Sequence, residues 1–102
     1  MMKGGLPNLE MLDLRQNVLG DEGGVVIAQD LLKGAYRQIR EIFVQQNQIR
    51  DTGISALFKA ATAAARVDYF PKLELLNARM NDATPKLVGS LGLGKIPISM
   101  RI

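Results

Sequence analysis

The sequence predicts an α/β fold: a short solenoid with three to four parallel strands on one face and helices on the other, wound as a right-handed β–α superhelix. Three observations predict it. An apolar pattern recurs along the chain, an asparagine stands at the same place in each copy, and segments with a helical apolar face follow the first two copies. Because one strand–helix unit cannot bury its own apolar face, neighbouring units must stack and share a core.

The recurring pattern is L-x-x-L-x-L-x-x-N, with other apolar residues at some of its leucine positions. Its copies begin at Leu9, Ile39 and Leu73. The period-two alternation inside each copy indicates a short strand with one buried face. The amide at the end of each copy can satisfy backbone groups where the chain turns away, so stacked copies would form a ladder of amides. The residues of this expected asparagine ladder are Asn17, Asn47 and Asn81.

Helices are expected after the strands. Asp21 and Asp51 stand where the first two helices would begin, and we expect both to be N-caps. Thr84 and Pro85 predict the N-cap and first residue of a third helix, which glycines soon interrupt. The apolar faces of the first two helices are Val26, Ile27 and Leu31, then Ile54, Leu57, Phe58 and Ala61.

The repeats divide the chain into units at about 9–38, 39–72 and 73–91, preceded by a flank at 1–8. Residues 92–102 are either a disordered tail or a partial fourth strand, with Ile96 and Ile98 at its apolar positions. Pro97 would confine such a strand to the edge of the sheet. Neither end has an obvious polar cap, which is typical of a fragment of a longer array or of a chain that associates.

The sequence resembles the leucine-rich repeat family, and within it the ribonuclease-inhibitor-like class. The resemblance rests on LEMLDLRQNVLGDEGGVVIAQDLL and IREIFVQQNQIRDTGISALFKA and covers roughly residues 6 to 91. The class adds a G-D-x-G step, which residues 20–23 carry. Arg50 replaces the first glycine of this step in the second repeat, and the third repeat lacks its glycines.

Composition excludes several kinds of chemistry. The chain has 102 residues, enough for one small domain, and contains neither histidine nor cysteine. This excludes disulfides, zinc fingers, histidine-based metal sites and cysteine or histidine nucleophiles. Residues 89–95 match the spacing G-x-x-x-x-G-K, but Ile96 follows where a phosphate loop needs Ser or Thr. The sequence therefore predicts no catalytic residues, cofactor or metal.

Charge and hydropathy narrow the choice of partners. The net charge of +3 is small and its basic residues are dispersed, so solvated faces are favoured over nucleic-acid binding. No apolar run approaches the length of a membrane span, and the first residues lack a signal-peptide core. We therefore expect an intracellular, cytoplasmic protein that does not enter a membrane.

The variable positions between the leucines are expected to project from the open strand face, which is the concave surface of leucine-rich repeat folds. In columns across the strands they are Met11, Glu41 and Leu75; Asp13, Phe43 and Asn77; and Arg15, Gln45 and Arg79, with Gln16, Gln46 and Met80 at the strand ends. We interpret the columns as the partner-binding residues.

Phe43 is the most informative of these positions, because an outward aromatic side chain has no core to join. With Met11 and Leu75 it would form an apolar centre, and aromatic and arginine side chains dominate binding hot spots. The flanking arginines are Arg15, Arg40 and Arg79. Either a partner protein or a neighbouring copy or tail of this chain could cover such a surface.

The sequence thus predicts a protein–protein interaction module without catalysis of its own, whose partner offers some acidic surface to the arginines. Two alternatives remain open. The resemblance suggests a regulator of a small GTPase, of the GTPase-activating kind. The uncapped ends suggest a self-assembling structural module, joined through the solenoid ends or the strand face.

Overall fold

A computed structural model describes residues 9–34, 38–67, 73–92 and 99–102. The expected flank at 1–8 and the positions Ile96 to Ile98 lie outside the described residues. Four strands form one parallel sheet in the order β1-β2-β3-β4. The strands are β1 (Met11–Asp13), β2 (Glu41–Phe43), β3 (Leu75–Asn77) and β4 (Ser99–Arg101).

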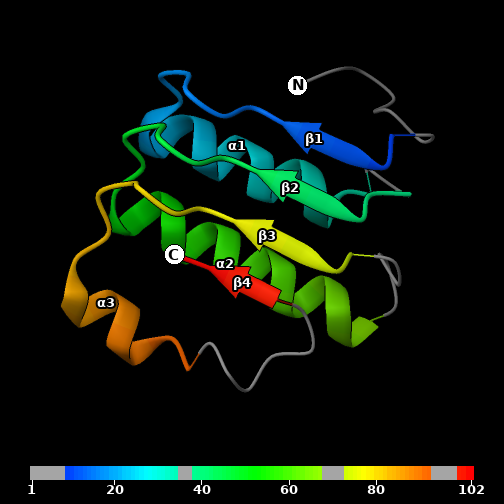
Figure 1. The fold of residues 1–102 in the computed structure, drawn as a ribbon. Helices are drawn as coiled ribbons and strands as arrows, with labels where there is room; N and C mark the ends of the chain where they lie inside the picture. The colour runs from blue at the N-terminus through cyan, green and yellow to red at the C-terminus, as the bar shows by residue number, and fades with distance from the viewer. Residues whose placement is uncertain (1–8, 35–37, 68–72, 93–98) are drawn as a thin grey trace.

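Helices follow the first three strands. They are α1 (Gly20–Leu32), α2 (Asp51–Val67) and α3 (Pro85–Ser90). Helices α1 and α2 lie side by side behind the sheet, and α3 lies beyond the end of β3 (Figure 1). One face of the sheet is thus covered by helices, and no described helix covers the other. The α/β solenoid expected from the sequence is confirmed, with parallel strands on one side.

The strand register follows the apolar repeat. Leu12 lies opposite Ile42, Ile42 opposite Leu76, and Leu76 opposite Met100, and all four side chains are buried. The residues on either side of each point away from the helices, because successive side chains of a strand face opposite ways. Each strand therefore contributes one central residue to the core.

The fourth strand lies further along the chain than the apolar pattern predicted. The sequence placed its apolar positions at Ile96 and Ile98, whereas Met100 takes the place opposite Leu76. Apolar residues alternate from Ile96 to Ile102, so any of them fits a period-two pattern equally well. The alternation could therefore predict a strand here but could not fix its register.

The core fills the space between the sheet and the helices. Its largest fully buried side chains include Leu31 from α1, Leu57 from α2 and Ile42 from β2. Burial of each such side chain stabilises the fold by about 1.5–3 kcal/mol relative to its exposure to water. Phe58 packs against this core while remaining partly exposed. Stacked repeats thus share one core, as the repeat argument requires.

The beginning of α1 differs from the sequence prediction. Leu19 is the N-cap residue of α1, and Asp21 lies within its first turn. The Asp21 carboxylate instead reaches the next repeat, where Oδ1 accepts hydrogen bonds from the amides of Arg50 (2.7 Å) and Gly53 (2.9 Å) at the start of α2. Asp21 therefore caps the following helix rather than its own.

The same relation holds one repeat further on. Asp51 Oδ1 accepts a hydrogen bond from the amide of Thr84 (2.7 Å), and its Oδ2 accepts another from the Thr84 hydroxyl (2.8 Å). Thr84 itself is the N-cap of α3, as predicted, and its hydroxyl accepts from the amide of Leu87, with Pro85 in the first turn. Each aspartate thus links two repeats.

Replacement of Asp21 by alanine tests this inter-repeat cap. Loss of the carboxylate leaves two amides of the first turn of α2 without their acceptor, so we expect the free energy of unfolding to fall by about 1–2 kcal/mol. Urea denaturation measures the loss. The neighbouring exposed side chain offers a control, since Glu22→Ala should cost less than half as much. Equal losses for the two variants would contradict the cap.

Helices α1 and α2 approach closely through glycines. A Cβ atom added to Gly24 would lie 3.2 Å from the Cα of Gly53 and 3.2 Å from Cγ2 of Ile49. Gly24 is buried, and so is Gly53. The absence of side chains at these two positions allows the helix starts to stack at the spacing of the strands in front of them.

Candidate functional site

A ladder of asparagine amides connects the ends of the strands. Asn47 is fully buried, and its Nδ2 donates hydrogen bonds to the carbonyls of Leu14 (2.8 Å) and Val44 (3.0 Å). Its Oδ1 accepts from the amide of Asn17 (3.1 Å), and Asn81 Oδ1 accepts from the amide of Asn47 (2.9 Å). The three asparagines thereby connect adjacent repeats at the same height, which holds the open face rigid.

Each of the first three strands is followed by a residue with left-handed backbone geometry. Gln16, Gln46 and Met80 have φ angles of 60°, 58° and 60°. This geometry is uncommon for residues other than glycine, and here it recurs at the same place in each repeat. Gln16 Nε2 also donates a hydrogen bond to Gln46 Oε1 (2.9 Å), so these side chains form a row across the strand ends.

The nine residues that the sequence placed in columns lie on one surface, which we call the strand face. The register puts Met11 opposite Glu41 and Glu41 opposite Leu75, and it aligns Asp13, Phe43 and Asn77 in the same way. Pairing continues past the strands through the hydrogen bonds from Gln16 N to Gln45 O (3.0 Å) and Gln46 N to Arg79 O (3.3 Å). The third column of the strand face is Arg15, Gln45 and Arg79.

Phe43 is less open than its sequence position suggested. It is half-buried, and the guanidinium carbon of Arg15 lies 5.7 Å from the centroid of its ring, within the range of a cation–π contact. Asp13 holds that guanidinium in place, with Nε donating to Oδ1 (2.9 Å) and a terminal nitrogen donating to Oδ2 (2.7 Å). Met11 is the more exposed apolar side chain of this centre, at 49%.

The Asp13–Arg15 pair also shifts its own titration. The hydrogen bonds that Arg15 donates from its side chain and then from its backbone lower the pKa of Asp13 below its usual value, and the same pairing raises the pKa of Arg15. Both groups are solvent-exposed, so the pair mainly sets the position of the guanidinium above Phe43. The apolar centre is therefore partly covered by a fixed cation.

The stabilising contribution of the Asp13–Arg15 pair should depend on pH. Because folding lowers the pKa of Asp13, its stabilising contribution is present above the unfolded-state pKa and disappears as the pH falls through the lower folded-state pKa. Carboxyl carbon shifts followed by NMR should give a midpoint below that of an ordinary aspartate. Arg15→Ala should raise this midpoint, whereas Lys86→Ala should leave it in place. A midpoint unmoved by Arg15→Ala would show that the pair does not form in solution.

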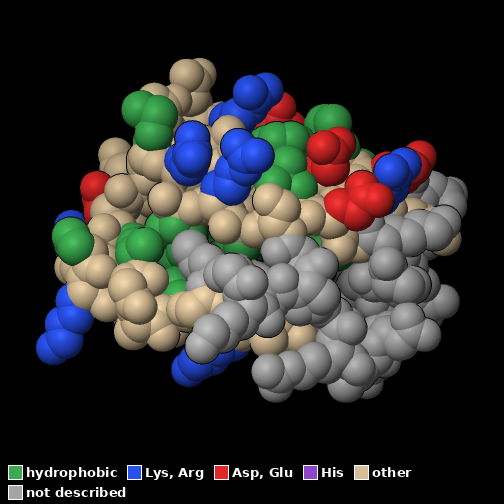
Figure 2. Space-filling model, turned by 60° about the horizontal axis from the view of Figure 1, so that its bottom comes forward, with side chains coloured by type: hydrophobic (Ala, Val, Ile, Leu, Met, Phe, Trp, Pro, Cys, Tyr) green, Lys and Arg blue, Asp and Glu red, His purple; other side chains and the backbone are tan. Residues whose placement is uncertain are grey.

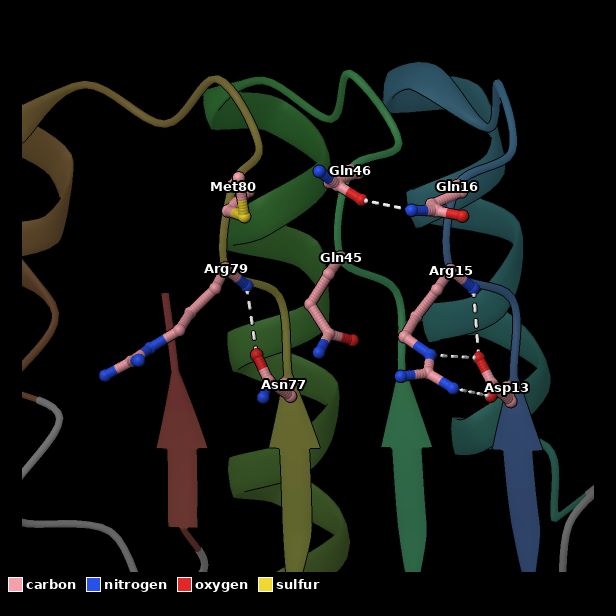
Figure 3. Close-up of a pocket in the computed structure, with 8 residues that line it drawn as sticks. All are labelled: Asp13, Arg15, Gln16, Gln45, Gln46, Asn77, Arg79 and Met80. Atoms are coloured by element: carbon pink, nitrogen blue, oxygen red, sulfur yellow. Dashed lines mark hydrogen bonds and ion pairs between the residues drawn. The ribbon is translucent and has the colours of Figure 1, made fainter.

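An open polar hollow of about 810 Å³ lies beside the pair, at the ends of the strands (Figure 3). Gln45 Oε1 is buried there and accepts no hydrogen bond from the described residues. A buried acceptor without a partner is costly and rare in native proteins. The residues lining the hollow are Asp13, Arg15, Gln16, Gln45, Gln46, Asn77, Arg79 and Met80.

Sequence reasoning found the columns but missed this hollow. It placed Gln16, Gln46 and Met80 at the strand ends without joining them to the columns. The signal that could have joined them was their common place in the repeat, directly after the third column. A left-handed residue at that place turns the chain away from the sheet and lets the side chains on both sides of the turn border one space.

A second, apolar hollow of about 440 Å³ lies at the outer side of the first repeat. It includes Val18, which is 79% exposed, together with Leu14, Leu19 and Val26. In the second repeat the corresponding surface is covered by the first. This hollow is the uncovered apolar end of the described solenoid.

In the described part of the chain, no group of three or more Asp or Glu side chains is placed to hold a metal ion. No helix built from the described residues is both long enough and apolar enough to cross a membrane.

The fold and the open strand face define a repeat protein that displays side chains from stacked strands. A leucine-rich repeat family model matches residues 5–28, the segment that contains β1 and the beginning of α1. Residues 5–28 are therefore similar to a leucine-rich repeat, and the four parallel strands in one sheet are consistent with a short repeat fold of that type. A comparison with curated proteins found no match. Leucine-rich repeat domains generally mediate protein–protein interaction.

Proposed function

We propose that this chain is a protein–protein interaction module that binds its partner through the strand face and has no catalytic activity of its own. One observation carries the proposal: the described helices pack against the opposite side of the sheet and leave the outward columns uncovered (Figure 1). A surface built from hydrogen-bonded strands and an asparagine ladder is already ordered. Binding on it costs little conformational entropy.

The chemistry of the strand face supports the same function. Phe43 and Met11 supply apolar contact area, and Arg15 is held above the aromatic ring by Asp13. Aromatic and arginine side chains are enriched among the residues that contribute most to binding energy. Gln45 Oε1 is buried and accepts no hydrogen bond from the described residues, which is a local cost to folding. Such violations are expected at functional sites.

Selection of a displayed library of randomised peptides against the full chain tests the proposal. Soluble wild-type protein should compete with the selecting protein for the bound peptides. Soluble Phe43→Ser should compete at least about tenfold less well, as expected for loss of a hot-spot residue. Gln45→Met should also weaken binding while leaving stability unchanged or increased, because it removes an unsatisfied polar atom. Lys59→Ser, on the exposed side of α2, is the control and should compete like the wild type. Peptides unaffected by both strand-face variants would overturn the proposal.

Self-association is a second candidate, favoured by the apolar hollow at the end of the first repeat. Light scattering across a concentration series separates it from partner binding. A dimer that Val18→Glu abolishes and Phe43→Ala preserves would place the contact at the solenoid end, and a dimer lost in Phe43→Ala would place it on the strand face. Monomers throughout the series would contradict self-association. Nothing in the described structure favours a GTPase regulator over general protein binding, and a GTPase turnover assay tests that role separately.

A further inference from the structure

The strand face has opposite charges at its two ends. Carboxylates gather where the strands begin, at Glu10, Glu41 and Glu74. Arg40 lies among them and pairs with Glu74 (3.2 Å) and with Glu10 (3.9 Å). Among the described residues at the strand beginnings, three carboxylates therefore outnumber the one cation, Arg40. Arg40, which the sequence placed beside the apolar centre, is thus paired with carboxylates at the strand beginnings.

The other end of the face is basic. Arg79 follows β3. Arg101 lies in β4 opposite Asn77, and Asn77 is two residues before Arg79 in the chain. Both arginines are exposed, and no carboxylate among the described residues pairs with either. Arg15 differs because Asp13 neutralises it. Figure 2 shows basic side chains near the middle of the visible surface and acidic side chains mainly to their right, with one basic side chain among them.

One of these two cations, Arg79, borders the polar hollow. Arg79 lines it and extends its side chain away from Gln45 toward β4 (Figure 3). The amides of Gln16, Gln46 and Asn77 offer both donors and acceptors in the same space. A peptide lying across the strand ends would therefore find hydrogen-bonding groups for its backbone and two uncompensated guanidinium groups beyond them.

We propose that the strand face recognises an acidic segment of its partner protein, whose carboxylates pair with Arg79 and Arg101 at the ends of β3 and β4. The inference rests on the proposed function and names the chemistry of the partner. Arginine suits this role because its planar fork of donors matches a carboxylate. The carboxylates at the strand beginnings repel the same segment, which confines it to the basic end.

A nucleic acid fits this surface less well. Its phosphates require several cations along one track, and the described strand face offers two unpaired arginines. Glu41 lies on the same surface and would repel a polyanion that crosses it. A short acidic segment avoids this carboxylate, because its charge can be confined to the ends of β3 and β4.

The peptide selection described above also tests this inference, with one added comparison. The selected peptides should be enriched in Asp and Glu, and the double variant Arg79→Gln/Arg101→Gln should compete for them at least about tenfold less well than the wild type. Lys33→Gln/Lys59→Gln removes the same charge from exposed positions outside the strand face and should compete like the wild type. Arg79→Lys/Arg101→Lys should compete at an intermediate level, because it keeps the charge and loses the fork.

The outcomes separate the two proposals. Suppose that the selected peptides depend on Phe43 but carry no excess of acidic residues, and that Arg79→Gln/Arg101→Gln competes for them as well as Lys33→Gln/Lys59→Gln. This result would overturn the acidic-segment inference and leave the proposed function standing. Peptides that depend on no strand-face residue would overturn both. An oligothymidylate that displaces the acidic peptides better than a free acidic peptide of equal charge would favour nucleic acid and overturn the inference.

Discussion

Replacement of Gly53 by alanine is expected to lower the free energy of unfolding by about 3 kcal/mol, a large share of the stability of a small domain. A Cβ atom at this position would overlap Cγ2 of the buried Ile49 and lie 3.0 Å from Oδ1 of Asp21. That oxygen accepts the hydrogen bond of the Gly53 amide. The methyl group would therefore push the beginnings of α1 and α2 apart, and it would also weaken the hydrogen bond between Asp21 and the Gly53 amide.

A glycine in a different setting provides the control. Gly89 lies within α3, and an added Cβ would meet no described atom within 4 Å. Gly89→Ala should therefore leave stability unchanged or raise it by about 0.5–1 kcal/mol, because alanine loses less backbone entropy on folding. Urea unfolding of the two variants measures the contrast. A Gly53→Ala protein as stable as the wild type would show that the helices do not stack this closely.

Replacement of Asn47 by alanine should cost about 4 kcal/mol. The side chain is fully buried and donates to the carbonyls of Leu14, Val44 and Gln45 while its oxygen accepts from the amide of Asn17. Alanine would leave these backbone groups without their partner, and an unpaired buried group costs about 1–3 kcal/mol. Thermal and urea unfolding both report the loss.

The ladder supplies its own control. Asn17 donates to the carbonyls of Leu14 (2.8 Å) and Arg15 (3.2 Å), but it is exposed. Water can replace its hydrogen bonds, so Asn17→Ala should cost about 1 kcal/mol. A loss for Asn47→Ala no larger than that for Asn17→Ala would mean that burial of the amide, and with it the coupling between repeats, contributes little.

The parts of the fold that could be predicted from the sequence depend on neighbours along the chain. The alternation around Leu12, Ile42 and Leu76 predicted three strands because one buried face requires it. Thr84 was predicted as an N-cap because a cap bonds to the amide three residues later. Asp21 was assigned to its own helix on the same reasoning, which was wrong, because stacking brings the start of the next helix within its reach.

The strand face was predictable in outline for a similar reason. A period-two pattern decides which residues point outward, so Phe43 and Gln45 could be placed without coordinates. Their surroundings depend on contacts across strands and on rotamers. The position of Arg15 above Phe43 follows from its pairing with Asp13, and the register of Met100 decides that Arg101 stands near Arg79. No pattern along the chain contains either fact.

Amide chemical-shift mapping of the full chain, titrated with the tightest peptide from the selection, shows whether the strand face is the binding surface of this protein. We expect the largest perturbations at residues 11–16, 41–46 and 75–80 and at Arg101. Perturbations concentrated in α1 or α2, with those strand residues unmoved, would contradict it.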